Sequence, residues 1–130
     1  MTRDLDLALH RLSRAREALR DGDLLLKGGS LTGAMSRLYY AAFYAARAVL
    51  ATRGMDANRH SGVIALFQQH FVKTGLIQAD VAKVLPRSFE RRQDSDYADF
   101  TVLELAEVSS LRAAVSDFVD ACARFVEQAR

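Results

Sequence analysis

Apolar side chains recur every three to four residues along most of this 130-residue chain, and this spacing is the strongest constraint on its fold. A helix brings such positions onto one face. No segment shows the repeated apolar–polar alternation that marks a half-buried strand. A single proline and abundant alanine and leucine also favour long helices. The pattern therefore predicts an all-α protein.

Turn residues divide the periodic segments. Four main helices are expected over about 3–27, 31–53, 59–74 and 101–128, with one or two short helices in 76–98, interrupted near Pro86. Glycines end the first three helices. Ser30 is the expected N-cap of the second helix, and Thr101 to Glu104 match a capping box for the last. We expect one domain, residues 1–130, folded as an up-and-down antiparallel four-helix bundle with one or two extra short helices.

Composition excludes several classes of function. The net charge is only +2, so a nucleic-acid site would need a local basic patch. The one cysteine, Cys122, rules out an internal disulfide and fits a small buried side chain. The charged start and the absence of an apolar run of ~20 residues predict a cytoplasmic protein without a membrane span. The histidines lack metal-ligand spacing and no phosphate loop is present, so we expect no metal and no cofactor.

The second helix carries four aromatic residues within six positions. Tyr40 and Tyr44 share a face with Arg37 and Arg47. The tyrosines could lie at the rim of a core helix with their hydroxyls outward. The same helix could instead form a subunit interface or line a cleft.

A charged run from Arg91 to Tyr97 lies between two helical patterns and has no evident packing role. Arginine forks bind phosphates, and tyrosine can stack on a base. The carboxylates Asp94 and Asp96 could bind a cation or simply neutralise the arginines. His60, at the start of the third helix, is a further candidate, and its pKa should be lowered by its position at the helix N-terminus.

Three segments taken in order resemble the HEPN (higher eukaryotes and prokaryotes nucleotide-binding) domain, in its small stand-alone prokaryotic form. They are Ser36-Arg-Leu-Tyr-Tyr-Ala-Ala-Phe-Tyr-Ala-Ala46, Arg59-His-Ser-Gly-Val-Ile64 and Phe89-Glu-Arg-Arg-Gln-Asp-Ser-Asp-Tyr97. The resemblance implies a helical bundle and a homodimer. In many relatives an Arg-x4–6-His motif from each subunit builds a metal-independent RNase. Such proteins are often toxins paired with a minimal nucleotidyltransferase antitoxin, which in some systems transfers AMP to a HEPN tyrosine.

This chain departs from the motif. Arg92 matches the family arginine, but Tyr97 stands where the shortest motif has histidine. Histidine acts as an acid or base because its pKa lies near neutrality, whereas that of tyrosine is about 10. The resemblance therefore implies either binding of nucleotide or RNA without cleavage, or a substitute group, for which His60 is the candidate.

The candidate catalytic residues are Arg92, Tyr97 and His60, and the candidate nucleotide- or RNA-binding residues are Arg91, Arg92, Asp96, Tyr97, Arg37 and Tyr40. Three functions remain open. The preferred one is a dimeric binding module paired with a nucleotidyltransferase in a toxin–antitoxin system. The second is an RNase toxin with a variant Arg/Tyr site, and the third is a purely structural helical interaction domain. Surplus apolar residues on the second and last helices are expected to contribute to a dimer interface.

Overall fold

The computed structural model describes residues 2–97 and 101–130, with side chains described from Asp4 to Asp96 and from Thr101 onwards. Its helices are α1 (Thr2–Lys27), α2 (Leu31–Ala51), α3 (His60–Phe67), the π-helical turn η1 (Gln68–Val72), α4 (Ala79–Ala82), α5 (Val84–Tyr97) and α6 (Leu105–Gln128). The described residues contain no strand, and the all-α expectation is confirmed.

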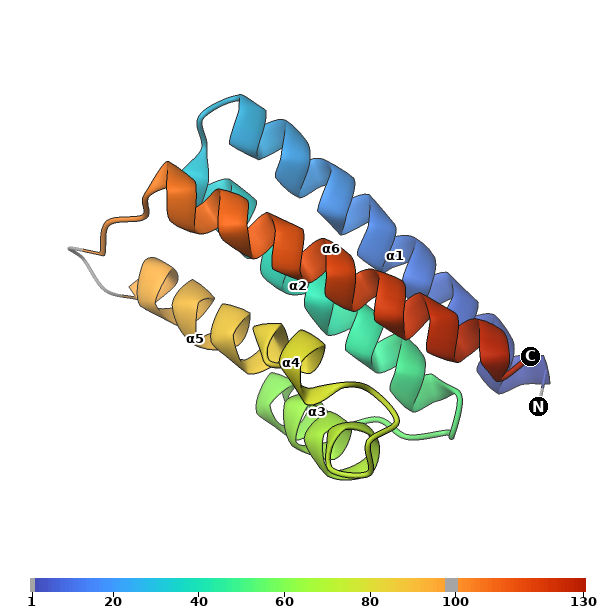
Figure 1. The fold of residues 1–130 in the computed structure, drawn as a ribbon. Helices are drawn as coiled ribbons and strands as arrows, with labels where there is room; N and C mark the ends of the chain where they lie inside the picture. The colour runs from blue at the N-terminus through green and yellow to red at the C-terminus, as the bar shows by residue number, and fades with distance from the viewer. Residues whose placement is uncertain (1, 98–100) are drawn as a thin grey trace.

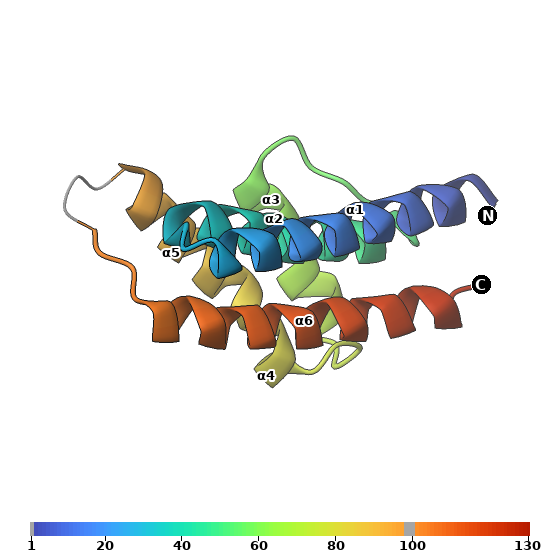
Figure 2. The ribbon, with the colours of Figure 1, turned by 90° about the horizontal axis from the view of Figure 1, so that it is seen from above.

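The four longest helices run up and down. In Figure 1, α1 and α2 are antiparallel, and so are α5 and α6, while α3 lies below the other helices and α4 leads into α5. Figure 2 shows α1 and α2 lying over α6. The N- and C-termini lie at the same end of the bundle in both views. The bundle expected from the apolar periodicity is therefore observed.

Helix α2 is the centre of the molecule, because α1, α3, α5 and α6 all pack against it. Its alanines, Leu38, Tyr39, Val49 and Leu50 are fully or almost fully buried. Small alanine side chains let neighbouring helices approach closely, while the large residues fill the space between them. Cys122, on α6, is also fully buried, as expected, and burial raises the pKa of its thiol.

Helix ends agree with the sequence where glycine is involved. Gly54 has a φ of 67°, and the amide of Met55 then reaches the carbonyl of Leu50 at 3.0 Å. This is the hydrogen bond of a helix ending through a left-handed residue, which glycine adopts without steric cost. Helix α2 itself ends at Ala51, two residues before the expected Arg53.

Of the two predicted N-caps, Ser30 is confirmed in position and Thr101 is wrong. Ser30 precedes α2 without a side-chain capping hydrogen bond. The last helix begins at Leu105 after Glu104, and the Thr101 hydroxyl donates to the Asp94 carbonyl at 2.9 Å, which joins the start of this segment to α5. A side chain that finds a tertiary acceptor is no longer available for a local cap.

The predicted helix over 59–74 is split into α3 and the π-helical turn η1, which ends at Val72. The interruption expected near Pro86 lies earlier, at Lys83, and Pro86 is the third residue of α5. Proline is tolerated in a first helical turn because the amide it lacks would have no partner within the helix. Helix α5 is therefore a full member of the bundle, which positions Arg92 against α2.

No helix in the described ranges combines the length and the apolar character that crossing a membrane requires.

Candidate functional site

A stripe of arginine and tyrosine runs along one side of α2. Arg37, Tyr40, Tyr44 and Arg47 are all half-buried, whereas Tyr39 and Phe43 on the adjoining face are buried. The spacing of three and four residues places the stripe on one helix face, as the sequence predicts. The tyrosine rings on this helix thus lie at the boundary between the core and the surface.

Arg92 extends from α5 across this stripe. Its guanidinium carbon lies 5.1 Å from the centre of the Tyr40 ring and 5.6 Å from that of Tyr39. Arg37 lies over the same Tyr40 ring, at 4.9 Å. Aromatic faces attract cations, and a stacked guanidinium keeps the edge that bears its N–H donors free. Tyr40 therefore brings two arginines from different helices to one place.

Asp96 lies one helical turn after Arg92, and its Oδ2 is 3.1 Å from the Arg92 Nε. The approach lacks hydrogen-bond geometry, so this is an ion pair rather than a hydrogen bond. In the described part of the chain, the terminal amino groups of Arg92 make no hydrogen bond. The Arg92 side chain is nevertheless only 20% exposed, which limits its freedom to move.

His60 begins α3 and enters the same cluster. Its Nδ1 lies 2.8 Å from the hydroxyl of Tyr39, and its ring stacks on Phe43 with centroids 4.1 Å apart. The Tyr40 ring meets His60 edge-on at 5.9 Å. His60 and Arg92, which are 32 positions apart in sequence, thus share Tyr39 and Tyr40 as neighbours.

The surroundings keep His60 neutral. Burial lowers the pKa of its imidazole, and the positive charges of Arg92 and Arg47 lower it further. The direction agrees with the sequence-based expectation, and burial and the two arginines contribute to it. Burial and the neighbouring Tyr40 raise the pKa of the Tyr39 hydroxyl despite the opposing effect of Arg92, so that hydroxyl stays protonated.

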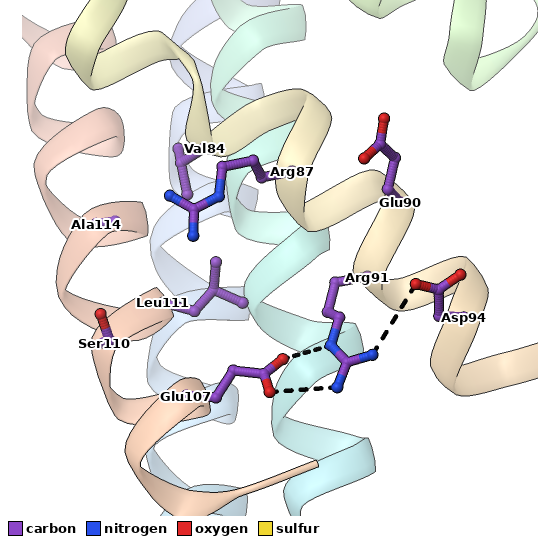
Figure 3. A pocket seen from close by; sticks show the side chains of 9 residues that line it. All are labelled: Val84, Arg87, Glu90, Arg91, Asp94, Glu107, Ser110, Leu111 and Ala114. Atoms are coloured by element: carbon purple, nitrogen blue, oxygen red, sulfur yellow. Dashed lines mark hydrogen bonds and ion pairs between the residues drawn. The ribbon is translucent and has the colours of Figure 1, made fainter. Parts of the chain in front are cut away.

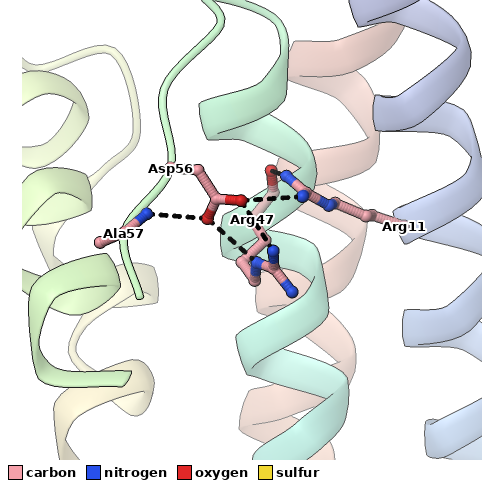
Figure 4. Close-up of polar contacts among 4 residues, drawn as sticks. All are labelled: Arg11, Arg47, Asp56 and Ala57. Carbon is pink, nitrogen blue, oxygen red and sulfur yellow. Dashed lines mark hydrogen bonds and ion pairs between the residues drawn. The ribbon is translucent and has the colours of Figure 1, made fainter. Parts of the chain in front are cut away.

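A polar network anchors the loop that leads to His60 (Figure 4). The Asp56 carboxylate accepts hydrogen bonds from Arg47 at 2.8 and 3.3 Å, from Arg11 at 3.1 Å and from the Ala57 amide at 2.8 Å. Burial works to raise the pKa of Asp56, but the hydrogen bonds of Arg47 and Ala57 and the charges of Arg47 and Arg11 outweigh it and lower that pKa. The network ties the start of α3 to α1 and α2.

Arg91 lies apart from this cluster. It forms an ion pair with Glu107 of α6, donates to the Val102 carbonyl at 3.1 Å and lies 3.9 Å from Asp94 (Figure 3). Consecutive helical residues point in directions about 100° apart, which separates Arg91 from Arg92. The sequence grouped these two arginines, but the structure does not bring Arg91 to Tyr40.

The Arg91 side chain lines a groove of about 410 Å³ between α5 and α6. Val84, Leu111 and Ala114 supply its apolar lining. Three carboxylates and two guanidiniums surround it: those of Glu90, Asp94, Glu107, Arg87 and Arg91. This excess of negative charge disfavours a phosphate ligand.

The structure therefore brings together four of the predicted residues: Arg37, Tyr40, His60 and Arg92, with Asp96 at the edge as the ion partner of Arg92. Tyr97 is the last residue of α5, and its side chain lies outside the described residues. We call Arg37, Tyr39, Tyr40, His60 and Arg92 the α2–α3–α5 cluster.

Sequence reasoning did not assign a role to Tyr39, Phe43 or Asp56. The i, i+4 spacing of Tyr39 and Phe43 marked a shared face but carried no sign that His60 would pack on it. Asp56 bridges two arginines, Arg11 and Arg47, from different helices. Among the described residues, no group of three or more potential metal ligands gathers at this or any other place.

Comparison with known proteins gives consistent results. The family model described as "HEPN domain" matches residues 8–127. A "UPF0332 protein" of Thermotoga maritima is 40% identical over 114 residues, which covers 88% of this chain and 86% of that protein. A Methanocaldococcus jannaschii protein named "Putative toxin" is 31% identical, over 82% of this chain and 78% of its own length.

A second Methanocaldococcus jannaschii protein, also named "Putative toxin", is 29% identical, over 66% of this chain and 58% of its own length. The matched range of the family model includes every residue of the α2–α3–α5 cluster. The chain belongs to the HEPN domain family.

Proposed function

We propose that this protein binds RNA or a nucleotide at the α2–α3–α5 cluster, through a phosphate group of that ligand. In this proposal the protein is the toxin-type member of a toxin–antitoxin system and does not cleave RNA. The observation that carries the proposal is the convergence of Arg37 and Arg92 on the Tyr40 ring. Each guanidinium lies about 5 Å from the centre of the same ring, and guanidiniums suit the bidentate recognition of phosphate oxygens.

The charge balance supports this site over the groove between α5 and α6. Asp56 neutralises Arg47, and Asp96 partly neutralises Arg92. Arg37 has no ion-pair partner among the described residues. The cluster thus retains positive charge, which favours an anionic ligand.

The Tyr40 ring has a supporting role in this proposal. With Arg37 and Arg92 both over it, and with Tyr39 and His60 at its sides, the ring is occupied by protein groups. We infer that phosphate contacts dominate binding and that base stacking on Tyr40 contributes little. Binding should accordingly depend strongly on salt and weakly on sequence.

A titration of fluorescently labelled single-stranded RNA, followed by anisotropy, tests the proposal. Loss of a charge-assisted hydrogen bond of about 1.5–3 kcal/mol predicts that Arg92→Ala weakens binding about 10- to 100-fold. Arg37→Ala should also weaken binding. In each variant the slope of log affinity against log salt concentration should become shallower by about one, as expected for one lost phosphate contact. Arg124→Ala, on the exposed surface of α6, is the matched control. Equal affinity of wild type and Arg92→Ala would contradict the proposal, and no binding at all would favour a purely structural domain.

Cleavage of RNA is the second candidate function. The observation in its favour is that His60, the candidate substitute for the missing motif histidine, lies beside Tyr39 and Tyr40 together with Arg92. In that mechanism Arg92 would stabilise the negatively charged transition state and His60 would transfer a proton. Arg92-dependent cleavage of RNA by purified protein would establish it.

We further propose a homodimer and a nucleotidyltransferase antitoxin as partner. Two relatives that carry the name "Putative toxin" support the toxin assignment. The half-buried arginine–tyrosine stripe of α2 offers a surface on which a second subunit could complete the site. A monomer by light scattering at micromolar concentration would contradict the dimer. Absence of a complex with a nucleotidyltransferase encoded beside this protein would contradict the partner.

A further inference from the structure

The Tyr39 hydroxyl is a buried polar group with one partner. Tyr39 is 0% exposed, and the only hydrogen bond of its hydroxyl within the described residues is to His60 Nδ1, at 2.8 Å. A buried hydroxyl that leaves its proton without an acceptor loses the stabilisation that water would provide. The His60 ring is therefore the natural acceptor for the Tyr39 proton.

This contact selects one tautomer of His60. A neutral imidazole has one nitrogen that donates and one that accepts. If Tyr39 donates to Nδ1, the imidazole proton must lie on Nε2. If Nδ1 carried the proton instead, the Tyr39 hydroxyl proton would have no acceptor among the described residues. The first arrangement satisfies both groups, and the second leaves a buried donor unpaired.

The ring cannot easily turn away from this contact. Phe43 stacks on it with an interplanar angle of 26°, and Tyr40 meets it nearly perpendicularly, at 90°. The Asp56 network holds the preceding loop. Packing on two sides and an anchored backbone hold the plane of the ring, and a flip within that plane would place a carbon against the Tyr39 hydroxyl and lose the hydrogen bond to Nδ1.

We propose that Tyr39 is a positioning residue that holds His60 as its Nε2–H tautomer, so that His60 presents a hydrogen-bond donor, and not a base, to a phosphate bound at Arg37 and Arg92. This inference rests on the proposed function for the identity of the ligand. The tautomer of His60 is a property of the free protein and does not depend on the proposed function.

The charges around His60 agree with this role. Arg92 faces the ring from α5 and Arg47 from α2, while Tyr39 and Tyr40 are the other titratable groups of α2 beside it. Both arginines oppose a positive charge on His60, and burial adds to their effect. A neutral imidazole can still donate one hydrogen bond to a phosphate oxygen, without further charge repulsion from the arginines.

The assignment also separates binding from cleavage. A general base that takes a proton from a ribose hydroxyl must offer an unprotonated nitrogen. In the Nε2–H tautomer the only such nitrogen is Nδ1, which already accepts the Tyr39 proton. Tyr39 therefore occupies the lone pair that a base would need.

A histidine titration by NMR on the free protein tests the tautomer. Nitrogen-15 shifts at pH 7.5 should show His60 with its proton on Nε2. Tyr39→Phe removes a donor that stabilises the neutral ring, so the His60 pKa should rise in this variant. Tyr40→Phe is the matched control and should leave it unchanged. An Nδ1–H tautomer in the wild type, or a His60 pKa that falls or stays constant in Tyr39→Phe, would overturn the assignment.

The donor role is tested separately with RNA. Glutamine can offer an N–H in place of Nε2–H but cannot act as a base near neutral pH. His60→Gln should therefore keep RNA affinity within about threefold of the wild type, while His60→Ala should weaken it about 2- to 10-fold. Equal losses in the two variants would overturn the donor role. Failure of the wild type to bind RNA would refute the proposed function but leave the NMR result on Tyr39 unaffected.

Discussion

Replacing Tyr39 by phenylalanine removes one oxygen atom and, with it, the hydrogen bond to His60. The ring volume and its contacts with Phe43 and Phe89 are retained. A net contribution of about 0.5–1.5 kcal/mol is typical of such a bond, and leaving a partly desolvated nitrogen without a donor adds to the loss. The free energy of unfolding should therefore fall by about 1–2 kcal/mol.

Urea denaturation at pH 7.5, followed by circular dichroism, measures this change. The midpoint should fall at a constant slope, because the folded structure remains compact. For a chain of this size the melting temperature should fall by about 3–8 °C. Tyr40→Phe is the matched comparison, since the Tyr40 hydroxyl makes no hydrogen bond within the described residues. Its unfolding free energy should change by less than about 0.5 kcal/mol.

A double-mutant cycle that combines Tyr39→Phe with His60→Ala tests whether the lost stability comes from the contact between Tyr39 and His60. If the contact is the cause, the coupling energy should be about 1 kcal/mol, and Tyr39→Phe should have little effect once His60 is absent. Equal stability of Tyr39→Phe and Tyr40→Phe, or a coupling energy near zero, would refute the reasoning. The Tyr39 hydroxyl would then not depend on His60.

Three further predictions concern pH and ion pairs. The His60 pKa is lowered in the folded protein from its ordinary 6.5. As the pH falls, the unfolded chain therefore takes up the His60 proton before the folded protein does, so the stability that neutral His60 contributes is complete above about pH 6.5 and is lost below it. Urea midpoints measured from pH 7.5 to 5 should fall in the wild type and fall less in His60→Ala. Asp56→Asn removes the charge that pairs with Arg47, and it should lower the free energy of unfolding by about 1 kcal/mol, because the carboxylate is partly exposed. Unchanged thermal stability in this variant would mean that the Asp56–Arg47 pair does not anchor the loop. Arg91→Ala should lower the free energy of unfolding by only about 0.2–1 kcal/mol, because the ion pair of Arg91 with Glu107 is exposed. The variant should keep its RNA affinity within about twofold of the wild type. A tenfold loss of affinity would show that Arg91 belongs to the binding site.

The sequence predicts the bundle well because apolar periodicity depends on local spacing. Helix ends at Gly54 and Gly75 follow from the left-handed backbone that glycine adopts, with φ of 67° and 79°. The failed capping box at Thr101 shows the limit of local rules. Its hydroxyl donates to the carbonyl of Asp94 in α5, a competing acceptor that no local pattern contains.

The site is less predictable for a related reason. The face shared by Arg37 and Tyr40 could be derived from helical spacing, and Arg92 from the family motif. The contact of His60 with Tyr39 joins residues 21 positions apart on different helices. The separation of Arg91 from Arg92 likewise depends on which face of α5 meets α2. These contacts arise from the packing of helices against one another, which the local patterns of a single sequence do not reveal.

The central claim is that the α2–α3–α5 cluster binds RNA through Arg92 but does not cleave it. The most direct measurement incubates labelled RNA with saturating purified protein and follows both bound fraction and RNA length over hours. Wild type should bind RNA that stays intact, and Arg92→Ala should lose binding. Time-dependent cleavage by the wild type that disappears in Arg92→Ala would contradict the account.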